Sequence, residues 1–243
     1  MRAIILAAGK GERLRGIMGD VPKPMVRIKG NPILEHNIEW LRSFGIKDIY
    51  INLHYLPDVV KNHFVDGAKW RVKISYSYES QLLGTAGAVR KIIEDYWIEE
   101  LKNKQISSTF LVIYGDNLFE YDLKKIINFH QIKKGIATVA VYEKDDVTQS
   151  GVVLLDRDDK ILKFIEKPKS KEIISQLVNT GIYVLEPAVL SYIPHNKPSD
   201  FGRDIFPEMI KKNEEVFGTI VKGNLTAIDT PKLLGEVMER EGG

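Results

Sequence analysis

Residues 3–16 pass from a short apolar segment directly into a glycine-rich basic loop, Ala3-Ile4-Ile5-Leu6-Ala7-Ala8-Gly9-Lys10-Gly11-Glu12-Arg13-Leu14-Arg15-Gly16. The apolar segment is too short for a signal peptide and charged residues follow it at once, so it is predicted to be a buried strand. Glycines after a buried strand allow backbone N–H groups to approach a phosphate closely. The stretch therefore predicts a first strand that ends at an anion-binding loop.

Beyond this stretch, short apolar runs alternate with segments of helical periodicity. Strands are predicted at residues 3–8, 48–53, 73–78, 110–114, 136–142, 151–155, 161–165, 181–185, 216–221 and 226–228. One helix is predicted to begin at an Asn31 cap with Pro32 at its first position and to end at Gly45. Others are predicted at 57–64, 86–96, 122–134, 171–177, 203–212 and 231–240.

This alternation predicts a Rossmann-like, three-layer α/β sandwich. Its central sheet is expected to be mixed and mainly parallel, with ligands at the carboxyl ends of the strands. Strands cluster more densely after about residue 135, which predicts a small antiparallel extension. No linker rich in Pro, Gly or Ser interrupts the chain, so residues 1–243 are predicted to form a single domain.

The composition excludes several classes of protein. Lys and Arg number 35 against 33 Asp and Glu, so a net charge of +2 argues against a nucleic-acid partner. The absence of cysteine excludes disulfides, thiolate metal sites and a cysteine nucleophile. No apolar run approaches the ~20 residues of a membrane helix, so we expect no membrane partner and a cytoplasmic location. The oligomeric state stays open, with a homo-oligomer as one outcome.

The segment from Gly9 to Asn31 is long for a connection inside a domain, and such connections are usually functional. A dinucleotide-binding motif would need glycine at Leu14, and a P-loop would need Lys and Ser or Thr after Gly16. Both motifs therefore fail. A solvated loop is the alternative, but Lys23 lies between two prolines that stiffen its backbone, which favours an anion site.

Asp116 directly follows an apolar strand. A carboxylate in this position beside a phosphate site suits a hard cation such as Mg²⁺, and the alternative is that it caps a helix.

The five histidines show no metal-ligand or catalytic pattern and are expected to be structural: His36, His54, His63, His130 and His195.

The stretch 6–14, followed by Pro22-Lys23-Pro24, resembles the signature of the sugar-1-phosphate nucleotidyltransferases. The resemblance continues through Leu83-Gly84-Thr85-Ala86-Gly87, Gly115-Asp116, Glu166-Lys167-Pro168 and Asn179-Thr180-Gly181. It is greatest to short guanylyltransferases that act on mannose or heptose 1-phosphate. One departure is Glu12, where many relatives have Ser or Thr.

The resemblance implies a role for each matching residue. Arg13 and Lys23 would be catalytic, gripping the triphosphate and its α-phosphate. Asp116 would hold Mg²⁺ together with Asp229, although the latter is displaced by two residues from the usual position and otherwise caps the last helix. The nucleotide would be bound by Leu6, Ala8, Gly9, Gly11, Glu79, Gly84 and Thr85. The sugar phosphate would be bound by Gly151, Glu166, Lys167 and Asn179, with the nucleotide-binding half at about 1–120 and the sugar-binding half at about 121–243.

The implied reaction joins a nucleoside monophosphate to a sugar 1-phosphate and releases pyrophosphate. It needs no general base, because a phosphate monoester, with a second pKa of about 6, is already anionic. Glu79 lies where pyrimidine-specific relatives have glutamine, and a carboxylate accepts the two adjacent donors of guanine, which favours GTP. Gln81 is an alternative reader, and Glu79 is otherwise a surface residue.

Three other functions are alternatives for this chain. One is a uridylyl- or thymidylyltransferase, and another is a non-catalytic regulatory subunit of the same fold that senses nucleotide sugars. Retention of Arg13, Lys23 and Asp116 argues against the sensor. An NAD-linked enzyme is disfavoured by Leu14.

Overall fold

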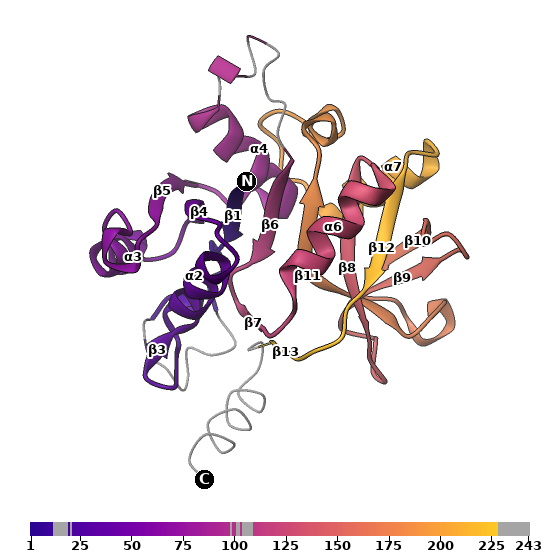
Figure 1. The fold of residues 1–243 in the computed structure, drawn as a ribbon, viewed down its shortest axis with the longest axis horizontal. Coiled ribbons are helices and arrows are strands. Elements are labelled where there is room, and N and C mark those ends of the chain that lie inside the picture. The colour runs from indigo at the N-terminus through magenta and orange to yellow at the C-terminus, as the bar shows by residue number, and fades with distance from the viewer. Residues whose placement is uncertain (12–18, 20, 98, 101–102, 104–108, 228–243) are drawn as a thin grey trace. The chain divides into compact units, whose positions relative to one another are not determined.

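The computed structural model describes residues 1–11, 19, 21–97, 99–100, 103 and 109–227 (Figure 1). It divides into two compact units. Unit 1 comprises residues 1–82, 113–120 and 223–243, and unit 2 comprises residues 83–112 and 121–222. The prediction of a single domain with a boundary near residue 120 stays a prediction.

Unit 1 is built on strands in the order β6-β1-β4-β5, where β6 (Phe110–Tyr114) is shared between the units. β1 (Arg2–Leu6) and β4 (Asp48–Leu53) run parallel, as do β4 and β5 (Lys73–Tyr78). Ile4, Ile5 and Ile51 are fully buried. These strands form because their β-branched side chains are covered by protein on both faces, which is typical of parallel sheets.

Two helices and several short elements complete the described part of unit 1. Helix α2 (Ile33–Ser43) packs against β7 (Asn117–Phe119), and α3 (Pro57–Phe64) packs against β5. The connection from β1 to α2 holds a 3-10 turn, η2 (Lys23–Met25), and a short antiparallel pair, β2 (Arg27–Ile28) with β3 (Asn31–Pro32). A second antiparallel pair joins β7 to β13 (Leu225–Ala227), and a 3-10 turn, η3, covers Ala68–Trp70.

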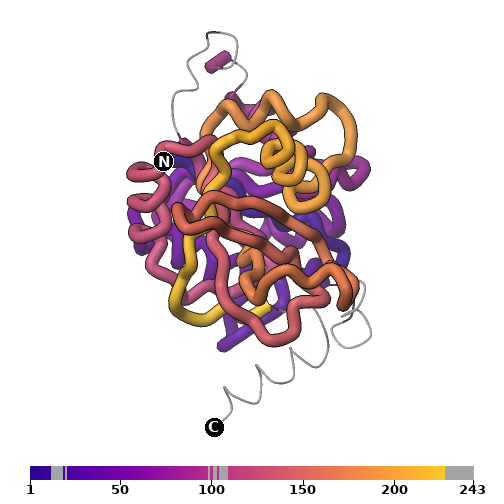
Figure 2. Tube along the Cα trace, turned by 90° about the vertical axis from the view of Figure 1, so that its right-hand side faces the viewer, coloured from indigo at the N-terminus to yellow at the C-terminus, as the bar shows by residue number. Residues whose placement is uncertain are grey.

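Unit 2 contains the antiparallel part of the sheet. β9 (Gly151–Leu155) pairs with β10 (Ile161–Glu166), and the two strands run side by side as a hairpin in Figure 2. β11 (Leu177–Leu185) pairs antiparallel with both β9 and β8 (Ala137–Glu143), whereas β12 (Val216–Ile220) runs parallel to β8.

The helices of unit 2 are α4 (Gly84–Tyr96), α6 (Leu123–Lys133) and α7 (Phe206–Lys211), with 3-10 turns η4 (Ser170–Glu172) and η5 (Pro187–Ser191). Helix α6 packs against β8, β11 and β12. A five-residue π-helix, η6 (Phe201–Ile205), precedes α7. Its ring at Phe201 lies 5.2 Å from the ring of Tyr183 and 5.4 Å from that of Phe206, so aromatic contacts hold η6 against β11.

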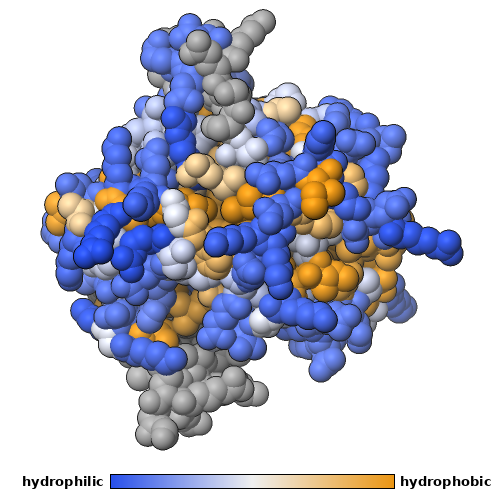
Figure 3. Space-filling view, viewed as in Figure 1, coloured by the Kyte–Doolittle hydropathy of each residue, from blue (hydrophilic) through white to orange (hydrophobic). Residues whose placement is uncertain are grey.

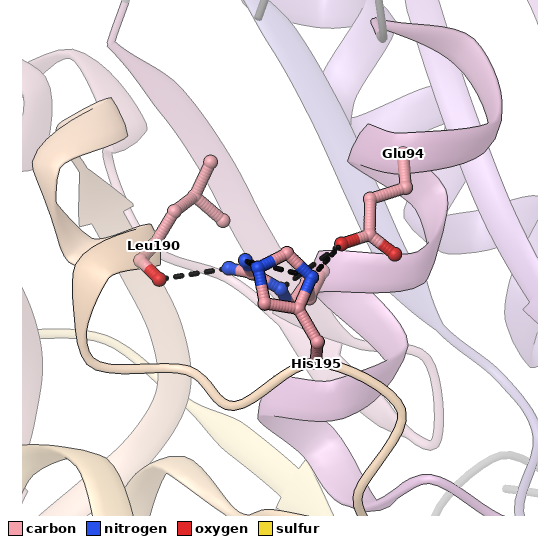
Figure 4. A network of polar contacts seen from close by, with 4 residues as sticks. Glu94, Leu190 and His195 are labelled. Carbon is pink, nitrogen blue, oxygen red and sulfur yellow. Dashed lines mark hydrogen bonds and ion pairs between the residues drawn. The ribbon is translucent and has the colours of Figure 1, made fainter.

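A charged network also fastens α4 within unit 2 (Figure 4). Arg90 donates to the carbonyl oxygen of Leu190 over 2.8 Å and pairs through Nε with Glu94 Oε1 at 3.0 Å. His195 Nδ1 lies 2.8 Å from the same Glu94 oxygen. The helix is thereby joined to residues 190–195, which lead into η6.

The predicted α/β class, with a mixed sheet and a small antiparallel part, is confirmed. The helix predicted at 171–177 is wrong: the structure has η4 there and begins β11 at Leu177. Asn31 is not a helix cap, because it pairs in β3 and α2 begins at Ile33. The predicted helix at 231–240 lies outside the described residues.

Hydrophobic side chains on the face seen in Figure 3 form patches separated by hydrophilic ones. Large exposed hydrophobic residues include Ile132, Leu162 and Ile220. In the portion of the chain that the structure covers, no helix is both long and apolar enough to span a bilayer.

Candidate functional site

The carboxyl ends of the unit 1 strands coincide. Leu6 at the end of β1 is in register with Asn52 of β4, and Asn52 is in register with Ser77 of β5. The turn after β6 joins them, because the Gly115 N–H donates to the Leu6 carbonyl oxygen over 2.8 Å. Residues that follow these strands therefore meet along one edge, where ligands bind in open parallel sheets.

Lys23 lies in η2 and is buried, with 10% of its side chain exposed. Its Nζ lies 2.5 Å from Asp116 Oδ2, so the structure brings the predicted catalytic lysine and the predicted metal ligand into contact. Gly11 explains part of this arrangement. Its φ is +62°, and a Cβ there would lie 3.1 Å from Lys23 Cβ. The second glycine of the loop is therefore needed for the chain to pass closely over the lysine.

Asp116 is held through the backbone of its neighbour. A Cβ on Gly115 would lie 2.9 Å from the Leu6 carbonyl oxygen, so only glycine allows the turn to approach β1 this closely. The carbonyl of Gly115 also accepts from the buried Asn37 side chain at 3.4 Å. Asp116 keeps 33% of its side chain exposed, which leaves its carboxylate accessible to a ligand.

Glu79 is buried, with 2% of its surface exposed, so the alternative that it is a surface residue is wrong. Its Oε1 accepts from Asn52 Nδ2 over 2.7 Å, and its backbone N–H donates to the Leu53 carbonyl over 2.8 Å. Gln81, the alternative base reader, is exposed. The Leu6, Ala8 and Gly9 positions lie at the end of β1 and the start of the loop, in the same unit as Glu79.

Gly84 and Thr85 lie in unit 2, at the start of α4. Gly84 has φ +73°, and a Cβ there would meet the Ser199 carbonyl oxygen at 2.5 Å. The Thr85 hydroxyl donates to Asp200 Oδ1 over 3.2 Å and accepts from the Phe201 N–H over 2.9 Å. This part of the motif thus fixes α4 against the segment that enters η6.

Glu166 lies at the end of β10 between two glycines. A Cβ on either Gly151 or Gly202 would lie 2.7 Å from Glu166 Oε2, so the carboxylate occupies a slot that side chains would close. Burial raises the pKa of Glu166, which the nearby cations Lys167 and Arg203 oppose. Lys167 itself adopts φ +50°, an uncommon conformation for a residue with a side chain that is often retained at functional sites.

Asn179 is satisfied within its own strand. Its Nδ2 donates to the Tyr183 hydroxyl over 2.7 Å, and its Oδ1 accepts from the Gly181 N–H over 2.9 Å. The register of β11 with β8 shifts between Asn179 and Tyr183, so the Asn-Thr-Gly motif builds a bulge. Sugar binding by Asn179 stays a prediction, and the observed contacts show a local structural role.

Arg13 and Asp229, with Glu12, lie outside the described residues. Within the described part, no group of three or more His, Cys, Asp or Glu side chains is placed to hold a metal ion. Of the two predicted metal ligands, Asp116 is therefore the one whose carboxylate the structure describes at this edge.

Comparison with known proteins places this geometry in context. A family model described as "Nucleotidyl transferase" matches residues 2–225. The chain belongs to this family. A UTP–glucose-1-phosphate uridylyltransferase from Synechocystis sp. is 38% identical over 86% of this chain and 55% of its own length. A probable mannose-1-phosphate guanylyltransferase 1 from Oryza sativa is 33% identical over 96% of this chain and 62% of its own. These relatives confirm the predicted sugar-1-phosphate nucleotidyltransferase family.

Two solved structures are similar to nearly the whole chain. HddC from Yersinia pseudotuberculosis complexed with GMP-PN has a TM-score of 0.78 and 28% identity, with 99% of each chain covered. A putative glucose-1-phosphate thymidylyltransferase from Bacillus anthracis has a TM-score of 0.83 and 27% identity, over 99% of this chain and 94% of that one. The chain spans 55% and 62% of the length of the two curated relatives named above.

Sequence reasoning missed three residues that hold the candidate residues in place: Asn52, Asp200 and Gly202. Asn52 lies inside a predicted strand and its bonds reach residues 45 and 27 positions away, so no local pattern marks it. Gly202 lies next to the helix predicted at 203–212, and nothing in the sequence indicates that it approaches Glu166. An internal Asn near the carboxyl end of a buried strand was the one signal available for Asn52.

Proposed function

We propose that this chain transfers GMP from GTP to a sugar 1-phosphate, forming a nucleotide sugar and pyrophosphate. The observation that carries the proposal is the buried Lys23, whose ammonium lies 2.5 Å from Asp116 at the carboxyl edge of the unit 1 strands. A cation and a carboxylate at that edge suit phosphoryl transfer, in which the protein mainly positions charged groups.

The reaction needs no general base from the chain. A sugar 1-phosphate carries the nucleophilic oxygen already ionised, since its second pKa is about 6. The obstacle is repulsion between this anion and the triphosphate. Lys23 Nζ would donate to the α-phosphate and offset the charge that develops there, and Arg13 would do the same for the departing pyrophosphate.

The residues present fit Mg²⁺ as the cofactor. Mg²⁺ is bound in such sites by one or two carboxylates, with substrate phosphates and water as the remaining ligands. Asp116 supplies one partly exposed carboxylate beside Lys23, and Asp229 would supply the second. When bound, Mg²⁺ would neutralise phosphate charge and align the phosphates.

Guanine is favoured by the chemistry of Glu79. A carboxylate only accepts hydrogen bonds, and the N1–H and N2–H₂ groups of guanine are adjacent donors. Its burial and its bond to Asn52 show a built environment rather than a solvated one. The relatives include a named guanylyltransferase and a structure complexed with GMP-PN, which support the same base. Mannose or heptose 1-phosphate is the proposed acceptor class.

A uridylyltransferase is the second candidate, because the 38% identical relative carries that name. Pyrophosphate release with GTP, UTP, dTTP, ATP and CTP, each against a panel of hexose and heptose 1-phosphates, separates the two. Turnover is expected with GTP, at least roughly tenfold above UTP. Turnover with UTP but not GTP would replace the guanine assignment. Binding of nucleotide sugars without any turnover would identify a sensor.

A further inference from the structure

One buried side chain connects the signature loop to the candidate base reader. Asn52, 4% exposed near the end of β4, accepts from the Ala7 N–H through Oδ1 over 2.6 Å. Its Nδ2 donates to Glu79 Oε1 over 2.7 Å. An amide side chain carries an acceptor and a donor on one short planar head, and Asn52 uses one of each.

The backbone of Glu79 is fixed independently of Asn52. Its N–H donates to the Leu53 carbonyl, and its own carbonyl oxygen lies 2.8 Å from His54 Nδ1. A carbonyl oxygen only accepts, so His54 carries its proton on Nδ1 in this contact. The main chain at 79 is therefore held by residues 53 and 54. Asn52 contributes something different, namely the orientation of the carboxylate.

We infer that Asn52 is a positioning residue for base selection. The side chain at position 79 ends in two polar atoms. Asn52 determines which of them is bonded to β4, and the other one is then presented to the nucleotide base. This inference rests on the proposed function, in which Glu79 reads the base. Through its bond to the Ala7 N–H, the same amide also fixes the start of the signature stretch 6–14 relative to Glu79.

An amide introduced at position 79 would be oriented by Asn52. In Glu79→Gln, Asn52 Nδ2 still needs an acceptor, so the introduced glutamine turns its oxygen toward Asn52 and presents its NH₂ group instead. A donor there faces the donors of guanine. In the double variant N52D/E79Q, the introduced aspartate still accepts from Ala7 but now also accepts from the glutamine amide. That amide then turns over and presents its oxygen, as the original carboxylate did.

The test measures kcat/KM for GTP and UTP, and their calorimetric binding without sugar, for wild type, E79Q, N52D and N52D/E79Q. E79Q is expected to lower the GTP-to-UTP ratio by roughly 10- to 100-fold. N52D places two carboxylates together and is expected to lower kcat/KM for GTP by a similar factor. The double variant is expected to recover the GTP-to-UTP ratio to within about tenfold of wild type. KM for the sugar 1-phosphate should stay within about twofold throughout.

Thr138→Val is the matched control. Thr138 is fully buried and bonds to His130 at 2.9 Å in unit 2, so its loss weakens the fold without touching residue 79. Its GTP-to-UTP ratio should equal that of wild type. Thermal melts establish which variants fold. If N52D does not, E79Q and the double variant still differ only at residue 52 and decide the question.

The outcomes separate this inference from the proposed function. A double variant that folds but keeps the ratio of E79Q overturns the role of Asn52. A wild type that prefers UTP overturns the guanine assignment, while a reversal of base preference between E79Q and the double variant would still support Asn52. A wild type that does not discriminate between bases, in turnover or binding, overturns both.

Discussion

The two sets of candidate residues are held in place in different ways. One set is proposed to act on the nucleotide, and the other is proposed to hold the sugar phosphate. In unit 1, the described groups follow the ends of parallel strands and are joined by charge and hydrogen bonds, as in Lys23 with Asp116. In unit 2, Glu166 is surrounded by glycines that leave room for its carboxylate. The positions of the nucleotide-binding groups depend on contacts between charged side chains. The position of the Glu166 carboxylate depends on the absence of side chains at Gly151 and Gly202. Substitutions should therefore have different consequences in the two units.

The largest effect is expected where charge is removed. Lys23→Ala should lower kcat by roughly 10³-fold, because a cation aimed at the developing charge is lost. The fold should persist, as checked by thermal melting. Lys124→Ala, at an exposed position on α6, is the control. Near-normal turnover of Lys23→Ala would contradict the proposed role.

The next largest effect is expected where a side chain is added beside the Glu166 carboxylate. Gly151→Ala and Gly202→Ala should each raise KM for the sugar 1-phosphate by roughly 10-fold or more, since either Cβ would displace the Glu166 carboxylate. Binding of the nucleoside triphosphate should change little.

Gly135→Ala is the control for this pair, because its Cβ would meet the Glu215 carbonyl oxygen at 2.5 Å, away from Glu166. It should lower the melting temperature without changing KM. An unchanged KM in both slot variants, with intact folds, would show that the slot does not serve the sugar.

Gly84→Ala tests how closely α4 must approach Ser199. The positive φ and the 2.5 Å approach to the Ser199 carbonyl oxygen should together cost about 2 kcal/mol or more of unfolding free energy, or roughly 4–8 °C in Tm. Gly30→Ala shares a positive φ but would meet nothing within 4 Å, so it isolates the backbone strain. Equal losses in the two variants would show that the contact with Ser199 contributes little.

The smallest effect concerns pH. Because burial raises the pKa of Glu166 above its ordinary 4.5, its ionised form destabilises the fold at pH values above that raised pKa. Glu166→Gln should raise Tm slightly at pH values above that raised pKa, and the gain should shrink as the pH falls through it. Glu143→Gln, at an exposed position, should show no such trend. A gain that grows toward acidic pH would have the wrong sign for a carboxyl whose pKa is raised by partial burial.

Four strands could be predicted from sequence to the residue: the ranges 48–53, 73–78, 110–114 and 151–155 match β4, β5, β6 and β9. In β4, β6 and β9 an apolar run stops at polar or turn residues, whereas β5 is marked by the alternation of its Lys73–Tyr78 sequence. The error at 171–177 has a long-range cause. Ser175 Oγ donates to the Val153 carbonyl over 2.5 Å, and Ile174 packs on the core around Val152, so contacts with β9 override a short helical pattern.

The candidate site could be predicted only where chemistry is local. Lys23 and the glycines of the loop were identified from their types and neighbours, Asp116 was assigned with the help of the family resemblance, and Lys23 and Asp116 do meet. Sugar binding by Asn179 was predicted from its motif and stays a prediction, and the structure adds that one bond of each of its polar groups lies within β11. Asn52 and Gly202 were missed because their partners are distant in sequence. Pairings of this kind depend on register and fold, which a single sequence does not display.

The hydrogen bonds of Asn52 also constrain how such a protein can change over generations. Replacing Glu79 by glutamine keeps the bond to Asn52, because an amide oxygen accepts as a carboxylate oxygen does. Replacing Asn52 by aspartate first sets two buried acceptors against each other with no donor between them. The two substitutions are thus not interchangeable in order. The order that begins with Glu79→Gln keeps both hydrogen bonds of Asn52, whereas the order that begins with Asn52→Asp breaks the bond to Glu79 first.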